Sequence, residues 1–345
     1  MSVRILPVPG VPEITAGDDL GAVIAEAVGA AGLALEPGDI LVFASKIVAK
    51  ALGLRRHTSR DAAIAAETLR VVAERTTAGR VTRVVEAAAG PVMAAAGVDE
   101  SNLGPDGGVL VLPRDPDAAA RAVLDSLRRA LDWPEDRALG VIVSDTAGRP
   151  WRAGVVDFAL GSAGVVALHD HRGDSDTDGR PLVVTTIAVA DEIAAAADLV
   201  KGKISHQPVA VVRGLPWATT DPGMSSASDL VRTGPGDWFH TGPVEAVRAA
   251  LGVVPGSVDA TEIGIRSVGP EKAGDRAARA VRVALHAVEG VVATADWPQV
   301  ELHADDEFVL GRALASLEVA CASEDLTVES VDRTGSRLTV TLAEC

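Results

Sequence analysis

The stretch LGVIVSDTAGRPWRAGVVDFALGSAG, residues 139–164, gives the strongest indication of the fold. Its first residues, LGVIV, form a short apolar run that is typical of a buried strand. An Asp, a Thr, two Arg and a Trp follow, and glycines stand at Gly154, Gly161 and Gly164. A chain that leaves a buried strand into polar, glycine-rich residues builds either a turn or a binding site.

Strand and helix signals alternate on both sides of this stretch. Apolar and β-branched runs predict strands over 3–8, 39–48, 108–113, 139–146, 182–190 and 208–215. Apolar residues at helical spacing, several behind acidic starts, predict helices over 20–28, 60–76, 115–131 and 191–202. This alternation predicts an α/β fold.

The chain changes character after residues 217–243, which are rich in Ser, Thr, Gly and Pro and predict a long surface connection. We expect a domain boundary near residue 245, which separates a domain at 1–245 from a small α+β domain at 246–345. The second domain is predicted to contain helices at 275–288 and 306–322 and a hairpin at 327–342.

Composition restricts the class of function. The 345 residues are 48% hydrophobic and carry a formal net charge of -16, which argues against a nucleic-acid partner. The two cysteines cannot supply a disulfide framework or a Cys-based zinc site. We find neither a signal peptide nor an apolar run long enough to span a bilayer, and we therefore expect a cytoplasmic protein without a membrane partner.

Acidic residues at the expected strand ends are candidate metal ligands. Asp145 and Thr146 directly follow the buried run, and ligands of α/β sheets bind beyond the carboxyl ends of strands. Their oxygens suit a hard cation such as Mg²⁺ or Mn²⁺. Asp99 and Asn102 lie in a second glycine-rich loop. The alternative for each segment is an ordinary turn, capped by Asp and satisfied by the backbone.

Lysines at predicted element ends are candidate anion contacts. In SKIVAK, Ser45 and Lys50 stand at and just past a strand end, where Lys50 could meet a phosphate or simply be solvated. Lys201 and Lys203 flank a glycine at a helix end, where cations are also favourable for structural reasons alone. Neither a P-loop nor a GxGxxG fingerprint is present, so any nucleotide is held in another way.

Arg149 and Arg152 complete the polar part of the opening stretch, on either side of Trp151. An arginine binds phosphate or carboxylate groups through two parallel hydrogen bonds. These arginines are candidate contacts to an anionic substrate. The competing interpretation is a structural ion pair with Asp157, and the sequence alone does not separate the two.

Six stretches resemble one family, coenzyme F420-0:L-glutamate ligase, also called F420-0:gamma-glutamyl ligase. They are LPVPGVPEI, GDILVFASKIVAK, AGVDESN, VIVSDTAGRPWRAGVVDFALGSAG, VADEIAAAADLVKGK and VAVVRGL, in the order that the family has. The actinobacterial type is the most similar. The resemblance implies a two-lobed, mixed-sheet α/β fold for the first domain.

The resemblance also implies a reaction. The family joins L-glutamate to the carboxylate of coenzyme F420-0 through an acyl phosphate, in the biosynthesis of coenzyme F420, and GTP is the co-substrate. It implies Mn²⁺ or Mg²⁺ with K⁺ as cofactors, and a homodimer.

The family's site residues map onto matching positions here. The resemblance implies catalytic roles for Asp145 and Lys50, and metal binding by Asp99, Asp145 and Thr146. It implies GTP contacts by Gly10, Val11, Pro12, Glu13, Ser45, Lys50 and Asn102.

Some positions depart from the family pattern. Leu52 and Leu54 replace a Glu and an Arg, and Ala89 and Ala95 replace a His and an Asn. Two alternatives therefore stay open: a non-catalytic relative that binds nucleotide or coenzyme, and a ligase for a different carboxylate. In some relatives the ligase is fused to a nitroreductase-like domain, and residues 246–345 are either a shortened remnant of it or an unrelated module.

Overall fold

The computed structural model of the chain describes every residue except 1, 102, 104–106, 203–206 and 222. Contacts divide it into two compact units. The N-terminal unit comprises Met1–Thr68 and Ala87–Arg232, and the C-terminal unit comprises Leu69–Glu86 and Thr233–Cys345. The C-terminal unit therefore includes a segment from early in the chain. A boundary between folding domains near residue 245 stays a prediction.

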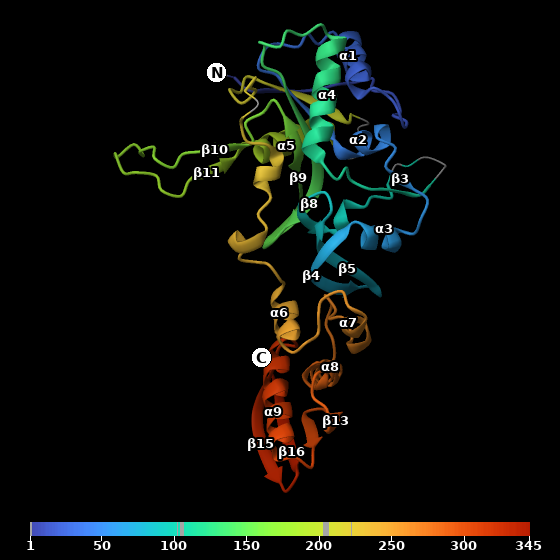
Figure 1. Cartoon of the computed structure of the whole chain (residues 1–345), viewed down its shortest axis with the longest axis vertical. Helices are drawn as coiled ribbons and strands as arrows, with labels where there is room; N and C mark the ends of the chain where they lie inside the picture. The colour runs from blue at the N-terminus through green and yellow to red at the C-terminus, as the bar shows by residue number, and fades with distance from the viewer. Residues whose placement is uncertain (1, 102, 104–106, 203–206, 222) are drawn as a thin grey trace. The chain divides into compact units, whose positions relative to one another are not determined.

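A five-stranded mixed sheet forms the centre of the N-terminal unit (Figure 1), in the order β1-β12-β2-β8-β9. Its strands are β1 (Arg4–Pro7), β12 (Val209–Arg213), β2 (Ile40–Ala44), β8 (Gly140–Arg149) and β9 (Arg152–Ala163). Only the β2–β8 pairing is parallel within this sheet, and the other three are antiparallel. The predicted α/β class with a mixed sheet is confirmed.

Helices cover both faces of this sheet. Ile40 and Val42 pack with Ile193 and Ala197 of α5 (Val189–Lys201) in one apolar cluster. Successive side chains of a strand point to opposite faces, so Leu41 and Phe43 face the other side, and all four β2 side chains are fully buried. On that other side α4 (Pro116–Ala130) contacts β8 and β9, and α1 (Leu20–Ala30) contacts α4.

The glycines of the opening stretch serve packing. A Cβ atom at Gly161 would lie 2.2 Å from the carbonyl oxygen of Pro116, where α4 begins. Gly164 has a φ of +65°, and a Cβ there would lie 2.4 Å from the Leu139 carbonyl oxygen. Glycine is required at both positions because backbone approaches backbone too closely for any side chain.

The remaining elements of the N-terminal unit are short. They are β3 (Arg55–Arg56), β6 (Val92–Ala94), β7 (Val109–Leu110), β10 (Leu168–Asp170), β11 (Thr186–Ala188), α2 (Ser45–Ala51), α3 (Arg60–Ala66), η1 (Ala95–Gly97) and η2 (Ala227–Leu230). β10 and β11 form a two-stranded hairpin that extends away from the main sheet in Figure 1. No helix within the described residues is long and apolar enough to cross a membrane.

Four predicted elements differ from the structure. The expected strand 108–113 is reduced to the two residues of β7. The expected strand 39–48 ends at Ala44, and SKIVAK begins α2. The expected helix 60–76 ends at Ala66, and the β-branched run after it forms β4 (Thr68–Thr77). The expected strand 182–190 is shortened to β11. Short apolar runs of this kind fit either a strand or a helix, and their boundaries depend on tertiary packing.

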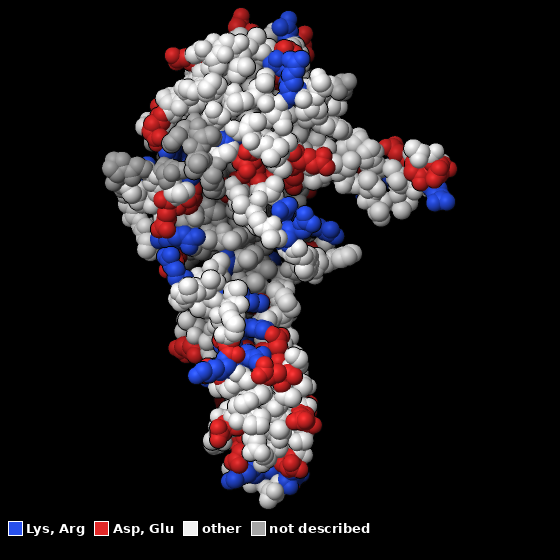
Figure 2. Space-filling model, turned by 180° about the vertical axis from the view of Figure 1, so that it is seen from behind, with Lys and Arg blue, Asp and Glu red and all other residues white. Residues whose placement is uncertain are grey.

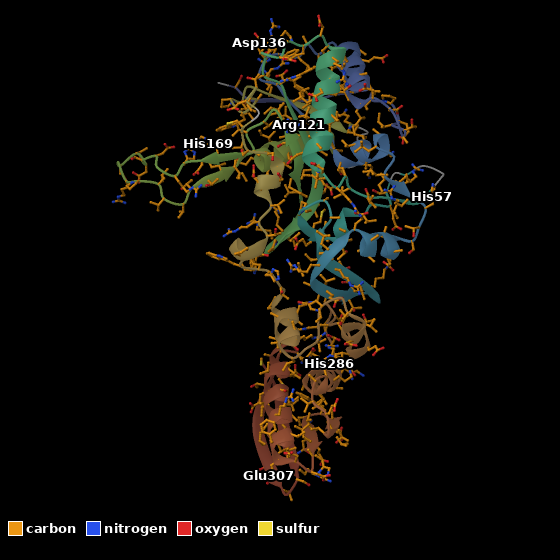
Figure 3. The ribbon with its side chains drawn as sticks, in the orientation of Figure 1. His57, Arg121, Asp136, His169, His286 and Glu307 are labelled. Carbon is orange, nitrogen blue, oxygen red and sulfur yellow. The ribbon has the colours of Figure 1, made fainter. Side chains whose placement is uncertain are left out.

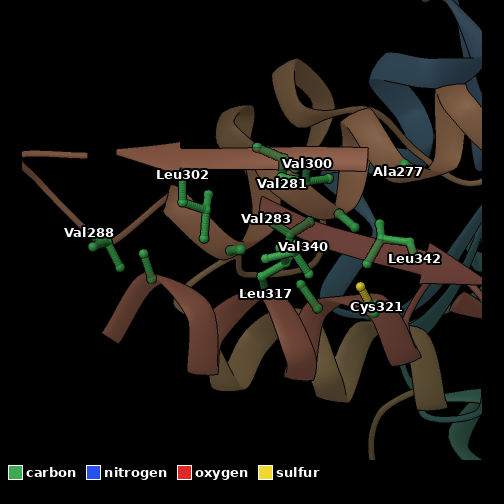
Figure 4. Packing of buried hydrophobic residues seen from close by; sticks show 14 of the residues in the cluster. Ala277, Val281, Val283, Val288, Val300, Leu302, Leu317, Cys321, Val340 and Leu342 are labelled. Carbon is green, nitrogen blue, oxygen red and sulfur yellow. The ribbon is translucent and has the colours of Figure 1, made fainter. Parts of the chain in front are cut away.

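The C-terminal unit is built on a four-stranded antiparallel sheet in the order β13-β14-β16-β15. Its elements are β4, β5 (Arg80–Ala87), η3 (Gly234–Gly236), α6 (Pro243–Ala250), α7 (Val258–Ile263), α8 (Ala273–Leu285), β13 (Val292–Asp296), β14 (Gln299–His303), α9 (Glu307–Ala322), β15 (Leu326–Thr334) and β16 (Arg337–Glu344). Val300, Leu302 and Val340 pack against Val283 and Leu317 from α8 and α9 (Figure 4). The predicted α+β module is confirmed.

The early segment 69–86 is bound into this unit by hydrogen bonds. Glu74 accepts a bond from the Gly256 backbone at 2.9 Å, and its own backbone N–H donates to Glu245 Oε1 at 3.0 Å. The Thr76 N–H donates to the Arg266 carbonyl at 2.9 Å. These bonds tie the β4–β5 segment to residues about 180 positions later.

A fully buried carboxylate, Glu324, joins the helices of this unit. Glu324 forms ion pairs with Arg248 and Arg279, each at 2.6 Å. Arg279 forms a second ion pair, with Glu271, at 2.7 Å. Burial opposes a charge on Arg279, but the hydrogen bonds that it donates to the carboxylates of Glu324 and Glu271 raise its pKa above the ordinary value.

Glu324→Ala should destabilise the C-terminal unit strongly. Removing one partner leaves two arginines buried without their shared counter-charge, which costs about 3–5 kcal/mol. Glu344→Ala is the matched control, because Glu344 pairs with Arg276 at 2.6 Å but is largely exposed, and its loss should cost less than about 1 kcal/mol. Urea denaturation of the three proteins measures the difference, and equal losses would contradict it.

Candidate functional site

A cavity of about 1280 Å³ opens in the N-terminal unit beside the ends of β2 and β8. Its lining contains basic and acidic side chains together. The basic ones are Lys46, Lys50, Arg55 and Lys201, and the acidic ones are Glu13, Asp99, Asp145, Asp157 and Asp198. His57, labelled in Figure 3, also lines it from the segment after β3. This volume exceeds that of most small-molecule sites, roughly 300–1,000 Å³.

The end of β2 creates the position of the cavity. β2 pairs with β8 as far as Ala44 and Ser144, and α2 then begins at Ser45. β8 continues to Arg149 and pairs with β9 along this extension. Asp145 and Thr146 therefore lie just past the end of the neighbouring strand, and both line the cavity.

Asp145 is placed against the start of α2. Ser45 Oγ donates a hydrogen bond to Asp145 Oδ1 at 3.0 Å, although the residues are 100 positions apart. Burial, together with the nearby carboxylates of Asp157 and Asp99, raises the pKa of the Asp145 carboxyl to about 6. A cation bound beside Asp145 would stabilise the ionised form of this buried carboxyl.

Asp99 lies at the same cavity but already has a cationic partner. Lys46 Nζ lies 2.8 Å from Asp99 Oδ2, and the Ser101 backbone N–H donates to Oδ1 at 2.7 Å. Burial disfavours the charged form, but these two partners hold the pKa of Asp99 below its usual value. Asp99 is a predicted metal ligand, and one of its two carboxylate oxygens is thus engaged in an ion pair with Lys46.

Thr146 takes part in a buried network with Asp157. Thr146 Oγ1 donates to Asp157 Oδ1 at 2.7 Å, and Ser144 Oγ donates to Oδ2 at 2.8 Å. Lys201 Nζ donates to Oδ2 at 2.8 Å and to Ser144 Oγ at 2.6 Å. Burial opposes ionisation, but the Lys201 charge keeps the pKa of Asp157 below its ordinary value. The predicted anion contact Lys201 is therefore paired with an acid of the chain.

Lys50 is buried at the far end of α2 and points to the first loop. Its side chain is 8% exposed and forms an ion pair with Glu13. Glu13, Val11 and Pro12 line the cavity, and Gly10 precedes them with a φ of +75°. Of the predicted nucleotide contacts in this loop, Glu13 is therefore the one that pairs with Lys50.

The other predicted contacts lie elsewhere. Arg149 and Arg152 are exposed at the turn between β8 and β9 and are not among the residues that line the cavity. Asn102 and Lys203 lie outside the described residues. The face in Figure 2 carries basic and acidic side chains interspersed, with no continuous basic surface among its described residues.

A comparison with protein families identifies the family of the chain. Residues 10–214 match the model of F420-0:gamma-glutamyl ligase, and this segment contains the predicted site residues. The chain belongs to the F420-0:gamma-glutamyl ligase family.

Curated members of this family from archaea align with most of their length. The chain is 39% identical over 234 residues to coenzyme F420:L-glutamate ligase of Methanothermobacter thermautotrophicus, which covers 63% of this chain and 91% of that protein. It is 38% identical over 257 residues to the Methanopyrus kandleri protein of the same name, covering 69% and 98%. The Archaeoglobus fulgidus protein is 38% identical over 249 residues, covering 68% and 94%. An actinobacterial type stays a prediction.

The sequence alone did not predict that Lys46, Ser144 and Asp157 take part in this site. One signal was available. If the chain turns at residues 149–152, period-two pairing of the flanking strands places Thr146 opposite Val155, and a register irregularity between Gly148 and Arg149 moves the partner to Asp157 on the same face. Asp157 then shares a sheet face with Thr146 and cannot be assigned to the arginines of the turn.

The donor set fits a hard divalent cation that also binds phosphate. Within the described residues no group of three or more His, Cys, Asp or Glu is arranged to hold a metal ion by itself. Asp145, Asp99 and Thr146 supply oxygens only, and Mg²⁺ is usually bound by one or two carboxylates together with waters and substrate phosphates. Buried Asp145, with a pKa raised to about 6, favours such a cation.

The raised pKa of Asp145 makes the stability of metal-free protein depend on pH. Unfolding returns this carboxyl from a pKa of about 6 to 3.8, so native stability falls as pH rises through this range. Above about pH 7 the penalty is on the order of 2–3 kcal/mol. With chelator present, Asp145→Asn should exceed the unchanged protein in stability near pH 7.5, and this advantage should vanish near pH 4. Urea denaturation at both pH values measures it, and a pH-independent difference would count against the assignment.

Proposed function

We propose that this chain forms an amide between L-glutamate and the carboxylate of coenzyme F420-0 at the expense of GTP, in coenzyme F420 biosynthesis. One observation carries the proposal: within the family segment, a single large cavity brings together Lys50, Asp99, Asp145 and Thr146. The curated relatives are named for coenzyme F420:L-glutamate ligation. The volume suits more than one substrate at a time.

The first step is phosphoryl transfer. A carboxylate oxygen of F420-0 attacks the γ-phosphorus of GTP, the bond from this phosphorus to the bridging oxygen breaks, and GDP leaves. In this proposal Lys50 neutralises phosphate charge and exchanges its ion pair with Glu13 for the triphosphate. The loop Gly10–Glu13 and Ser45 contribute further GTP contacts in this proposal.

The second step forms the amide. The amine nitrogen of L-glutamate attacks the acyl carbon of the acyl phosphate, the carbon–oxygen bond to phosphate breaks, and the nitrogen loses one proton. Asp99, Asp145 and Thr146 would hold Mn²⁺ or Mg²⁺, which supplies charge stabilisation at the phosphates, while K⁺ assists. The homodimer, the actinobacterial type and the cytoplasmic location are further parts of this proposal.

The departures from the family pattern leave the two predicted acidic metal ligands, Asp99 and Asp145, unchanged. Leu54 packs with Ala49, Leu103 and Leu110 in a small apolar cluster, and Leu52 is half exposed after α2. These two leucines are thus accommodated by packing or by solvent. This favours an active ligase over a non-catalytic relative, and a different carboxylate substrate is an outcome that product analysis would reveal.

Mass spectrometry of the products tests this function. Incubation with F420-0, GTP, Mn²⁺ and L-glutamate should give a product enlarged by one or more glutamates, with release of GDP and phosphate. Asp145→Asn keeps the side-chain shape but removes the charge, and it should abolish the product. Asp136→Asn, at an exposed loop labelled in Figure 3, is the matched control. Nucleotide binding without product or phosphate release would establish a non-catalytic relative.

Lys50→Ala should weaken GTP binding, because the triphosphate loses a buried positive charge. Lys272→Ala, at an exposed position of the C-terminal unit, should leave affinity unchanged. Titration calorimetry measures the affinities, and the same titration with ATP tests the expected preference for GTP. Equal affinity for both nucleotides would contradict the preference, and unchanged affinity in Lys50→Ala would remove this lysine from the site.

A further inference from the structure

The network around Asp157 fixes the direction of hydrogen bonds at the cavity wall. Lys201 is 3% exposed and its ammonium lies 2.8 Å from Asp157 Oδ2, so this buried acid is held as a carboxylate. A carboxylate only accepts hydrogen bonds. Thr146, whose Oγ1 lies 2.7 Å from Asp157 Oδ1, must therefore donate its single hydroxyl proton.

This direction determines what Thr146 can offer to a ligand. A hydroxyl has one proton and two lone pairs, and the proton is used by Asp157. The lone pairs on Thr146 Oγ1 remain for a further partner, and Thr146 lines the cavity beside Asp145. Oxygen lone pairs are the donors that a hard cation takes. A threonine free to rotate would present its proton there part of the time.

Ser144 strengthens the same arrangement. It is 1% exposed, accepts from Lys201 at 2.6 Å and donates to Asp157 Oδ2 at 2.8 Å. Both Asp157 oxygens are therefore occupied, and the carboxylate cannot rotate without breaking a buried bond. The Asp157 charge also cancels that of Lys201, which would otherwise repel a cation.

We propose that Asp157, with Lys201 as its counter-ion, is a positioning residue that holds the Thr146 hydroxyl as an acceptor toward a bound divalent cation. This inference rests on the proposed function, since it takes the cavity at Asp145 as the cation site. It assigns to the Asp157–Lys201 pair a role in cation affinity in addition to any role in folding.

A double-mutant cycle with Mn²⁺ alone tests the proposal. Nucleotide-free protein is titrated with Mn²⁺, and the electron paramagnetic resonance signal of free Mn²⁺ reports binding. Asp157→Asn should weaken Mn²⁺ affinity by about tenfold to a hundredfold, which is typical of groups that orient metal ligands. In a Thr146→Val background, Asp157→Asn should have little further effect, because the hydroxyl it orients is gone. Additive losses would overturn the proposal.

A charge-neutral pair of substitutions separates orientation from charge. Asp157→Asn combined with Lys201→Met removes one negative and one positive charge, so the net charge at the site is unchanged. If Asp157 positions Thr146, Mn²⁺ affinity stays reduced. Recovery of the unchanged protein's affinity would show that Asp157 acts by charge alone, and it would overturn the proposal.

Two further variants guard against effects on folding. Asp191→Asn is the matched control, since Asp191 accepts a hydrogen bond from the Ala159 backbone of the same strand, at 2.9 Å, and should keep full Mn²⁺ affinity. If Asp157→Asn fails to fold, Thr146→Ser and Thr146→Val carry the test. The serine retains the hydroxyl and should bind Mn²⁺ almost normally, and the valine should not. Equal affinities would overturn the proposal.

The outcome also separates this proposal from the ligase function. If the unchanged protein binds no Mn²⁺, the cation site is wrong and this inference falls with it. If it binds Mn²⁺ and Asp157→Asn binds equally well, only the positioning role is wrong. Product formation with F420-0 and L-glutamate, followed by mass spectrometry, reports the amide-forming activity independently of either result.

Discussion

The site depends on the parallel pairing of β2 with β8. Its register places Ala44 beside Ser144, and the next residue of each segment, Ser45 and Asp145, therefore meet in a hydrogen bond. β2 ends at this point, so a helix begins on one side while β8 continues on the other. A slip of one residue would turn the side chains of β8 to the opposite face and separate Asp145 from Ser45.

The α/β class and the position of Asp145 could be predicted because they follow from local patterns. An apolar run marks the buried strand, and the polar residues after it coincide with the end of the neighbouring strand β2, although β8 itself continues to Arg149. The Asp157–Lys201 pair could not be predicted in the same way. It joins β9 to the end of α5, and the packing of a helix on a sheet is set by the whole core. With no such contact to use, sequence reasoning related Asp157 to the arginines nearest to it.

The cavity is internally balanced in charge. Lys46 pairs with Asp99, Lys50 with Glu13 and Lys201 with Asp157. Asp145 is different, since its partners in hydrogen bonding carry no charge and its pKa is raised to about 6. Buried charges are retained at a cost unless they are paired, so the ionised form of Asp145 is stabilised poorly by the protein's own groups. The same lack of a counter-charge is what makes it suitable for a cationic ligand.

The C-terminal unit is discontinuous in sequence, and this affects how the protein folds during translation. Residues 69–86 leave the ribosome early, yet Glu74 and Thr76 find their hydrogen-bond partners in a segment about 180 residues later. At roughly 5–20 residues per second, translation takes roughly ten to thirty seconds to supply that segment. During this interval the β-branched hairpin has no completed partner. During translation the nascent chain therefore exposes a β-branched segment to which chaperones can bind.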